Sequence, residues 1–264
     1  MAYTDIDKPS DYFNTLLYTG DNSNRSFTGV GFEPSLTWIK ARNNTTWHLL
    51  YDAVRTAGTG KELHSNSDAA EGASNSSLYG YLSSFDSDGF STVNGSSSSD
   101  ALNETGKTYA AWNWKAGGSA SSNSNGSITS SVSANTTSGF SIVSYTGNGS
   151  AGATIGHGLS QKPSIIITKR RDSISNWLVY SSELGATKYL ELETTNAGQT
   201  ATSRWNDTEP TSSVFSVGTS TSANPSSGTM IAYCFAEKQG YSKFGSYTGN
   251  GNADGTFVYT GFKP

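Results

Sequence analysis

The chain repeats one sequence pattern three times, and this repetition limits the folds open to it. The motif Tyr-Thr-Gly begins at Tyr18, Tyr145 and Tyr247. Each time, a polar, glycine-bearing stretch follows and ends at a proline. Self-similarity at this scale is typical of duplicated modules.

The longest match between the copies starts at these prolines. From Pro34 the chain reads PSLTWIKARNNTTWHLLYD, and from Pro163 it reads PSIIITKRRDSISNWLVYS. Aligned without a gap, the two segments match Lys40 with Lys169, Arg42 with Arg171, and Tyr51 with Tyr180. The third copy reaches its proline at Pro264, where its next strand is expected to begin.

Strand-type segments dominate both full copies. Short runs rich in Val, Ile, Thr and aromatic residues lie between clusters of Gly, Asn, Asp, Ser or Pro, and helical periodicity is nearly absent. We expect strands at 13–18, 25–28, 36–42, 47–52, 61–63, 78–82, 89–93 and 108–114, and again at 128–133, 140–145, 153–155, 164–170, 177–180, 189–193, 214–217 and 229–236. This spacing predicts an all-β protein made of two tandem antiparallel β-sandwich, or jelly-roll, domains.

The composition along the chain sets the expected domain boundaries. Residues 1–118 form the first sandwich and residues 127–239 the second. Residues 119–126, rich in Gly, Ser and Asn, are predicted to be a flexible linker. Residues 240–264 begin an incomplete third repeat, with two strands and a turn that an isolated hairpin could not stabilise.

Charge and cysteine content exclude several functions. Charged residues make up 14% of the chain and the formal net charge is −4, so the attraction needed for nucleic-acid binding is missing. The one cysteine, Cys234, lies in an apolar strand segment and permits no disulfide within a chain. We also expect no secretion signal in the first residues and no membrane insertion.

Several of the repeated segments resemble a known family. They are YFNTLLYTGDNSNRSFTGVGFEPSLTWIK, SFDSDGF, YAAWNWKAGG, YTGNGSAGATIGHG, RWNDTEPTSSVFSVG, IAYCFAEKQGYSKFGSYTGNG and FVYTGF. Together, across residues 11–264, they look like a domain family found in marine bacteriophage structural proteins and often labelled tail fibre or tail protein. The resemblance implies a concanavalin A-like or laminin G-like β-sandwich on a virion surface. It carries over no catalytic or ligand-binding residues.

Aromatic residues, 12% of the chain, are the candidate sugar platforms, because the C–H face of a sugar packs on an aromatic ring. The candidates are Trp47, Trp177, Trp205, Tyr51 and Tyr180. Aromatic residues of a sandwich also serve as core, and the sequence leaves both roles open. Trp38, Trp112 and Trp114 are assigned to the core.

Charged residues offer two further candidate sites. Lys40, Arg42, Lys169 and Arg171 recur in register and suit a carboxylate or sulfate of an acidic glycan, or protection of a strand edge. Asp86 and Asp88 offer oxygen ligands for calcium, but the second copy has no acid there, and the pattern favours a turn over a metal site. No other cofactor is expected.

An enzymatic site finds little support in the sequence. A glycoside hydrolase needs two facing carboxylates, and the pair Glu191 and Glu193 lacks the Glu-x-Asp-x-Glu pattern of related sandwich hydrolases. We therefore expect a non-enzymatic phage virion protein, a tail-fibre or tail-associated adhesin assembled in the host cytoplasm. Its expected partners are other virion proteins, further copies of itself in a homo-oligomer, and a host surface polysaccharide. The alternatives are a purely structural head-decoration, fibre or tail protein and a polysaccharide depolymerase.

Overall fold

The computed structural model describes residue 4 and residues 6–97 and 101–262. These residues form antiparallel sheets joined by loops, which confirms the all-β class. In this described part, no helix is long and apolar enough to cross a bilayer. The elements are η1 (Pro9–Asp11), β1 (Phe13–Thr19), β2 (Arg25–Phe27), β3 (Leu36–Ala41), β4 (Leu49–Asp52), β5 (Leu63–His64), α1 (Ser76–Tyr79), β6 (Tyr81–Asp86), β7 (Gly89–Val93), β8 (Thr108–Trp114), β9 (Ser121–Asn123), β10 (Ser130–Asn135), β11 (Phe140–Thr146), β12 (Ala153–Gly156), β13 (Ile165–Arg170), β14 (Leu178–Ser181), β15 (Lys188–Glu191), β16 (Gln199–Thr200), α2 (Thr202–Trp205), β17 (Val214–Val217) and β18 (Thr229–Phe235).

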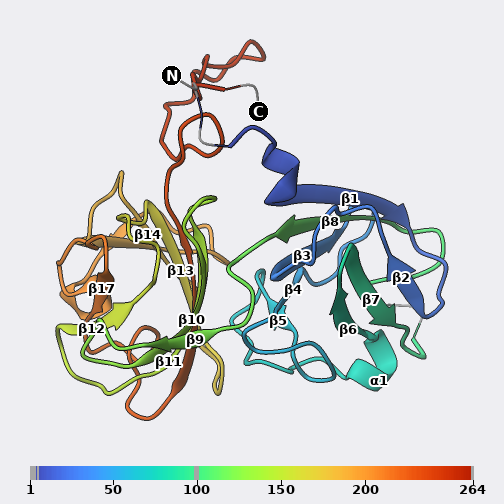
Figure 1. Cartoon of the computed structure of the whole chain (residues 1–264), viewed down its shortest axis with the longest axis horizontal. Helices are drawn as coiled ribbons and strands as arrows, with labels where there is room; N and C mark the ends of the chain where they lie inside the picture. The colour runs from blue at the N-terminus through green and yellow to red at the C-terminus, as the bar shows by residue number, and fades with distance from the viewer. Residues whose placement is uncertain (1–3, 5, 98–100, 263–264) are drawn as a thin grey trace.

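Two large sheets carry the same strand order (Figure 1). The first half, residues 6–118, has a five-stranded sheet in the order β1-β8-β3-β4-β5. The second half, residues 119–239, repeats this order as β11-β18-β13-β14-β15 inside an eight-stranded sheet. A smaller sheet accompanies each, β2-β7-β6 in the first half and β12-β17 in the second.

Each half has its own apolar cluster between its large and its small sheet. Because side chains alternate along a strand, every second residue of the large sheet faces the small one. In the first half the cluster includes Tyr18, Phe27, Ile39, Phe90 and Tyr109. In the second half it includes Tyr145, Ile155, Trp205, Phe215 and Met230.

A third apolar cluster lies between the halves and uses the other face of both large sheets. From the first half it includes Leu36, Leu50 and Leu63, with Trp38 and Trp114 packed against them. From the second half it includes Phe140, Ile142, Trp177, Ile231 and Tyr233. Strand β18 is therefore buried on both faces, one against the small sheet of its own half and the other against the first half, and this explains why its sequence is apolar throughout.

Charged side chains also connect the halves. Arg55 and Asp52 of the first half form a buried ion pair with 2.5 Å between Nε and Oδ2. The hydroxyl of Tyr233 in the second half donates to the same Asp52 carboxylate at 2.7 Å. Arg171 pairs with Glu71 across the boundary. Separating the halves would break the ion pair of Arg171 with Glu71 and the hydrogen bond from Tyr233 to Asp52.

The repeated Tyr-Thr-Gly motif closes the same loop in each half. The hydroxyl of Tyr18 donates to the carbonyl oxygen of Leu102 at 2.6 Å, and that of Tyr145 donates to Ala223 at 2.8 Å. A buried asparagine follows each acceptor, and its amide holds the loop after the motif. At Gly147 an added Cβ would lie 2.2 Å from the carbonyl oxygen of Pro225, so the motif needs glycine there.

The predicted linker is ordered, and this prediction was wrong. Ser121–Asn123 form β9, which pairs with β10 at the edge of the eight-stranded sheet. Its side chains bury little surface, so the order of the segment comes from its backbone pairing with β10. The composition of the segment indicates that its side chains bury little surface, but it does not show that the edge of β10 is available for pairing.

Two other local predictions differ from the structure. One-turn helices occur at α1 and α2, so Leu78 is helical and the strand expected there begins at Tyr81. In the tail, residues 240–262, the described residues contain no strand, although two were expected. Among the described residues, an isolated bridge joins Lys238 to Ser242 at the base of the tail. None of the strands in the described part of the chain pairs with these residues.

Candidate functional site

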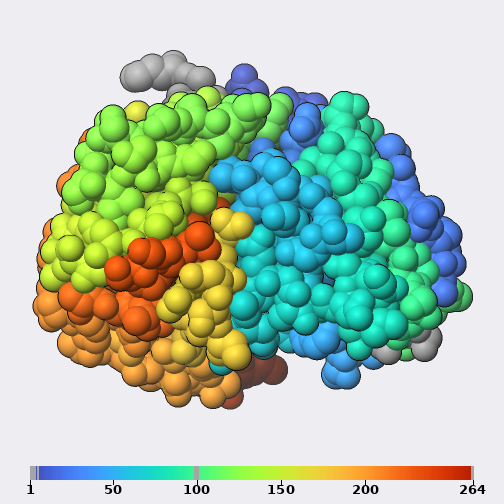
Figure 2. Space-filling view, turned by 90° about the horizontal axis from the view of Figure 1, so that it is seen from below, coloured from blue at the N-terminus to red at the C-terminus, as the bar shows by residue number. Residues whose placement is uncertain are grey.

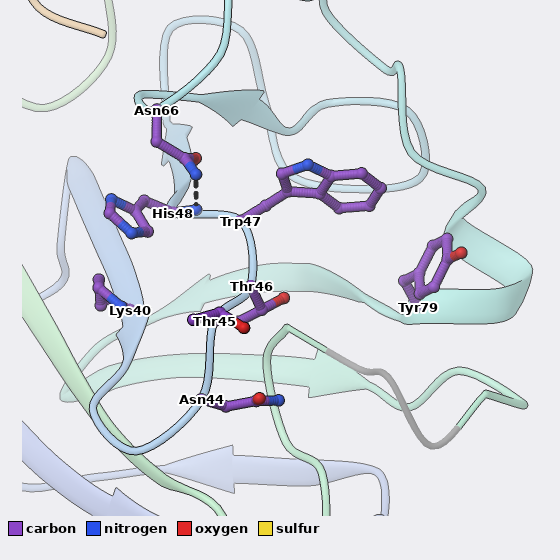
Figure 3. A pocket seen from close by; sticks show the side chains of 8 residues that line it. All are labelled: Lys40, Asn44, Thr45, Thr46, Trp47, His48, Asn66 and Tyr79. Atoms are coloured by element: carbon purple, nitrogen blue, oxygen red, sulfur yellow. Dashed lines mark hydrogen bonds between the residues drawn. The ribbon is translucent and has the colours of Figure 1, made fainter. Parts of the chain in front are cut away.

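An open cavity of about 570 Å³ lies in the first half, beside the loop between β3 and β4. Figure 3 shows the loop residues along one side, with Asn66 and Tyr79 reaching the cavity from later segments of the chain. The lining residues are Lys40, Asn44, Thr45, Thr46, Trp47, His48, Asn66 and Tyr79.

Trp47 presents the main aromatic surface of this cavity, with 37% of the residue exposed. Its indole stacks on the ring of His64, with 4.8 Å between ring centroids and 7° between planes. Tyr79, from α1, meets the indole edge-on at 5.5 Å. The two neighbours restrain the indole from one side and from its edge, so its orientation is set before any ligand binds.

Amide and hydroxyl groups surround the indole. The backbone N–H of His48 donates to Oδ1 of Asn66 at 2.9 Å, as Figure 3 shows, which leaves the Asn66 amino group as a donor. Thr45 and Thr46 add hydroxyl groups that both donate and accept. Lys40 lies at the other end, where its ammonium donates to the carbonyl oxygen of Ala41 at 2.7 Å. Such a mixture of donors and acceptors matches the hydroxyl groups of a sugar.

The electrostatics of the cavity are simple. Burial, together with the charge of Lys40, lowers the pKa of His48. Burial and the nearby ammonium of Lys169 lower the pKa of His64 to about 4, so this imidazole is neutral at physiological pH. Its Nε2 lies 2.8 Å from Oγ of Ser74. Lys40 therefore supplies the positive charge among the residues that line the cavity.

The residues around the cavity have a composition that can be compared with known kinds of site. A stacked, partly exposed indole with amides and hydroxyls around it resembles the usual chemistry of a sugar-binding pocket. None of the eight described residues that line it carries a carboxylate, whereas glycoside hydrolysis requires a pair of them.

The matching surface of the second half is covered by the first half. Lys169 corresponds to Lys40, and its ammonium donates to the carbonyl oxygen of Asp68 at 2.8 Å. Trp177 corresponds to His48, and its indole N–H contacts the carbonyl oxygens of His64 and Ser67 at 2.8 and 3.1 Å. Figure 2 shows this contact as the yellow surface of the second half meeting the cyan surface of the first. Asn176 stands where the first half has Trp47, so the duplication did not produce two equal pockets.

Most of the aromatic candidates from the sequence are buried, which rules them out as sugar platforms. Trp177 is 0% exposed between the halves, and Trp205 is 2% exposed inside the second half. Tyr51 and Tyr180 are also fully buried, and the hydroxyl of Tyr180 donates to Glu209 at 2.6 Å. Only Trp47 among these aromatic candidates presents an open ring to a cavity.

Of the basic candidates, Lys40 lines the cavity, whereas Arg42 and Arg171 do not. Arg171 pairs with Glu71 across the boundary of the halves, so it has a structural partner. Arg42 is exposed just beyond the end of β3, but it does not line the cavity around Trp47. Of the basic residues in the aligned segments, Lys40 is the one that reaches this cavity.

The acidic candidates have protein partners. Asp88 accepts hydrogen bonds from the backbone N–H groups of Gly29 and Gly31, which lower its pKa. Asp86 accepts from the hydroxyls of Ser84 and Ser91. Across the residues that the structure describes, no group of three or more His, Cys, Asp or Glu side chains is placed to hold a metal ion.

Sequence reasoning identified Lys40 and Trp47 as candidates and missed the other six residues of the lining, which are Asn44, Thr45, Thr46, His48, Asn66 and Tyr79. Asn44 belongs to a polar stretch just before Trp47, which is a local signal that pointed to this loop. Asn66 comes from a later loop and Tyr79 from α1, and no spacing in the sequence links them to Trp47. They are brought together by the pairing of β4 with β5 and by the position of α1.

The fold and this cavity define an all-β protein with an open polar pocket around a partly exposed indole. The chain belongs to a family described as a domain of unknown function, DUF7483, whose match covers residues 8–264 and therefore both halves and the tail. No curated protein and no solved structure matches the chain.

Proposed function

We propose that the chain is a non-enzymatic adhesion protein that binds a glycan in the cavity around Trp47. The observation that carries this proposal is the partly exposed indole of Trp47 in a cavity of about 570 Å³ lined by amides and hydroxyls. The absence of a carboxylate among the described lining residues favours binding over hydrolysis.

The resemblance to phage tail-fibre and tail proteins supports a place on the surface of a virion, where the chain meets a host polysaccharide. We further propose that each half is an antiparallel sandwich of the jelly-roll, concanavalin A-like type. The shared strand order of the two large sheets supports this, as does the separate apolar cluster of each half.

With one such cavity per chain, strong attachment would depend on several chains acting together. A sugar contact of this size is weak by itself, and linking several sites raises the overall affinity through effective concentration. The second half adds no equal site, because its counterpart surface is covered by the first half.

A purely structural role in the virion is the second candidate, and one observation favours it. Trp177 and Trp205, which an adhesive role would have left open, are buried. A structural protein needs no ligand, so this candidate predicts that Trp47 contacts another virion protein instead of a sugar. A depolymerase role has less support, since Glu193 accepts the backbone N–H of Trp177 and lies outside the cavity.

A glycan array followed by titration calorimetry on the full chain tests the proposal. We expect one class of glycan to bind, and Trp47→Ala to abolish the binding while the thermal unfolding curve changes little. Ile174→Ala is the matched control, because Ile174 is an exposed apolar residue at the aligned loop position of the second half that corresponds to Thr45. Binding that survives Trp47→Ala, or a chain that binds no glycan on the array, would overturn the proposal.

A further inference from the structure

The outer edge of β1 is open, whereas the matching edge in the second half is covered. β11 pairs with β18 on one side and with β10 on the other, and β10 in turn pairs with β9. β1 occupies the same place in the first half and pairs with β8. Within residues 6–97 and 101–262, no strand pairs with its other edge.

The backbone along this edge is blocked at both ends but free in the middle. The N–H of Thr15 is bound by the side chain of Asn14 at 2.9 Å, and the carbonyl oxygen of Thr19 by Arg25 at 2.9 Å. By strand alternation, the N–H and C=O of Leu17 point the same way as those groups. The described residues provide no partner for them, and the Leu17 side chain is 59% exposed.

The tail contains a strand-type segment that has no strand partner. Residues 256–260 read Thr-Phe-Val-Tyr-Thr, the residue types that favour strands. Phe257 is 85% exposed and Tyr259 is 76% exposed. Counted from its Tyr-Thr-Gly motif, Phe257 holds the position of Ile155, which is fully buried in the second half. The segment therefore carries residues of a buried strand on an exposed chain.

Neither segment has the usual protection against edge pairing. Natural edge strands carry charges or prolines that prevent association with other strands. β1 contains no charged residue and no proline, and the same is true of residues 255–262. Phe13, at the start of β1, also lines an apolar groove of about 330 Å³ between the halves, together with Trp114 and Phe235, which an added aromatic side chain could fill.

The base of the tail meets the segment just before β1, where the rings of Tyr12 and Tyr241 lie edge-on at 6.3 Å, but the residues beyond it lie against the second half. The hydroxyl of Ser246 donates to Glu183 at 3.5 Å, and residues 259–262 border a cavity together with Gln161 and Lys238. Figure 1 shows the tail, in red, projecting from the end of the molecule at which the chain begins. This position leaves the β1 edge for another molecule and places the tail where another molecule can meet it.

We propose that residues 256–260 of one molecule pair as an extra strand with the β1 edge of a second copy of this chain. Such strand addition gains main-chain hydrogen bonds at Leu17 and removes the exposed apolar side chains of both segments from water. The second half shows the result of covering this edge, because β10 already pairs with β11 in the same position.

Disulfide trapping between two single-cysteine chains tests the pairing directly. The full chain with Leu17→Cys is mixed with the full chain carrying Val258→Cys under mild oxidation. The native Cys234 is buried and contributes little background. We expect a crosslinked heterodimer, and none when Ile174→Cys replaces Leu17→Cys as the equally exposed control. No crosslink above that control would overturn the proposal.

Light scattering after size exclusion provides the second measurement. We expect the wild-type chain to associate as its concentration rises, and Val258→Pro to remain monomeric, because proline removes the backbone N–H and the substitution lies outside the two folded halves. Leu17→Lys should have the same effect by adding a charge to the edge, whereas Ile174→Lys should not. A wild-type chain that stays monomeric throughout, or association that survives both substitutions, would contradict the pairing.

Discussion

Replacing Trp177 tests how tightly the two halves are joined. Trp177→Ala removes a fully buried indole from the cluster between the large sheets, and such truncations cost about 3–5 kcal/mol. Trp177→Phe keeps an aromatic ring but loses the N–H that contacts His64 and Ser67, at about 0.5–1.5 kcal/mol for each contact. The expected order of stability is therefore wild type, then Trp177→Phe, then Trp177→Ala.

Urea unfolding followed by far-UV circular dichroism measures these differences. With a slope of about 3 kcal/mol per molar urea, Trp177→Ala should lower the midpoint by about 1 to 2 M. It should also separate the unfolding of the halves into two steps, because the lost contacts are those that couple them. Hydrogen exchange read by mass spectrometry would assign each step to one half.

Trp205→Ala is the matched control for this experiment. It removes an indole of the same size that is buried in the second half alone. We expect a lower midpoint with a transition that stays single, since the contacts between the halves remain. If Trp177→Ala lowers stability by less than about 1 kcal/mol, or if the two variants unfold alike, the inference of a tight joint fails.

Two further predictions concern buried groups described above. Burial lowers the pKa of Lys169 to about 8, against 10.5 for an ordinary lysine, so the unfolded chain binds more protons between these pH values, and the free energy of unfolding should rise with pH across that window. Lys169→Met should remove this rise in urea titrations, and an unchanged slope would contradict it. Gly147→Ala should lower stability by about 1–3 kcal/mol through the clash with Pro225, whereas Gly249→Ala, in the same motif with nothing within 4 Å, should change it by less than about 0.5 kcal/mol. Equal thermal unfolding of the two glycine variants would show that the tight approach is unimportant.

Much of the fold could be predicted from local sequence signals. The repeat around Pro34 and Pro163 gave matching strands, and β3 and β13 occupy the same place in their sheets. The strand expected at 108–114 is β8, and it lies between β1 and β3 in the five-stranded sheet. These features depend on neighbouring residues along one chain segment, and a sequence records them directly.

The contact between the halves could not be predicted in the same way. Alternation tells which side chains share a face, but it does not tell whether that face meets water or another sheet. Trp47 and Trp177 lie one position apart in the alignment, yet one borders an open cavity and the other is enclosed by a loop of the first half. Whether each side chain is exposed or buried depends on where residues 64–71 pack, and the sequence of this segment does not indicate which surface it covers.

The joint between the halves also sets how the molecule would respond to mechanical load. The Trp47 cavity belongs to the first half, while the tail leaves the second half after β18. A pull between a ligand in the cavity and a partner holding the tail would therefore pass through the packed faces of the two large sheets and through the ion pair of Arg171 with Glu71. Under tension, this boundary would share the force with the chain segment that joins β8 to β9.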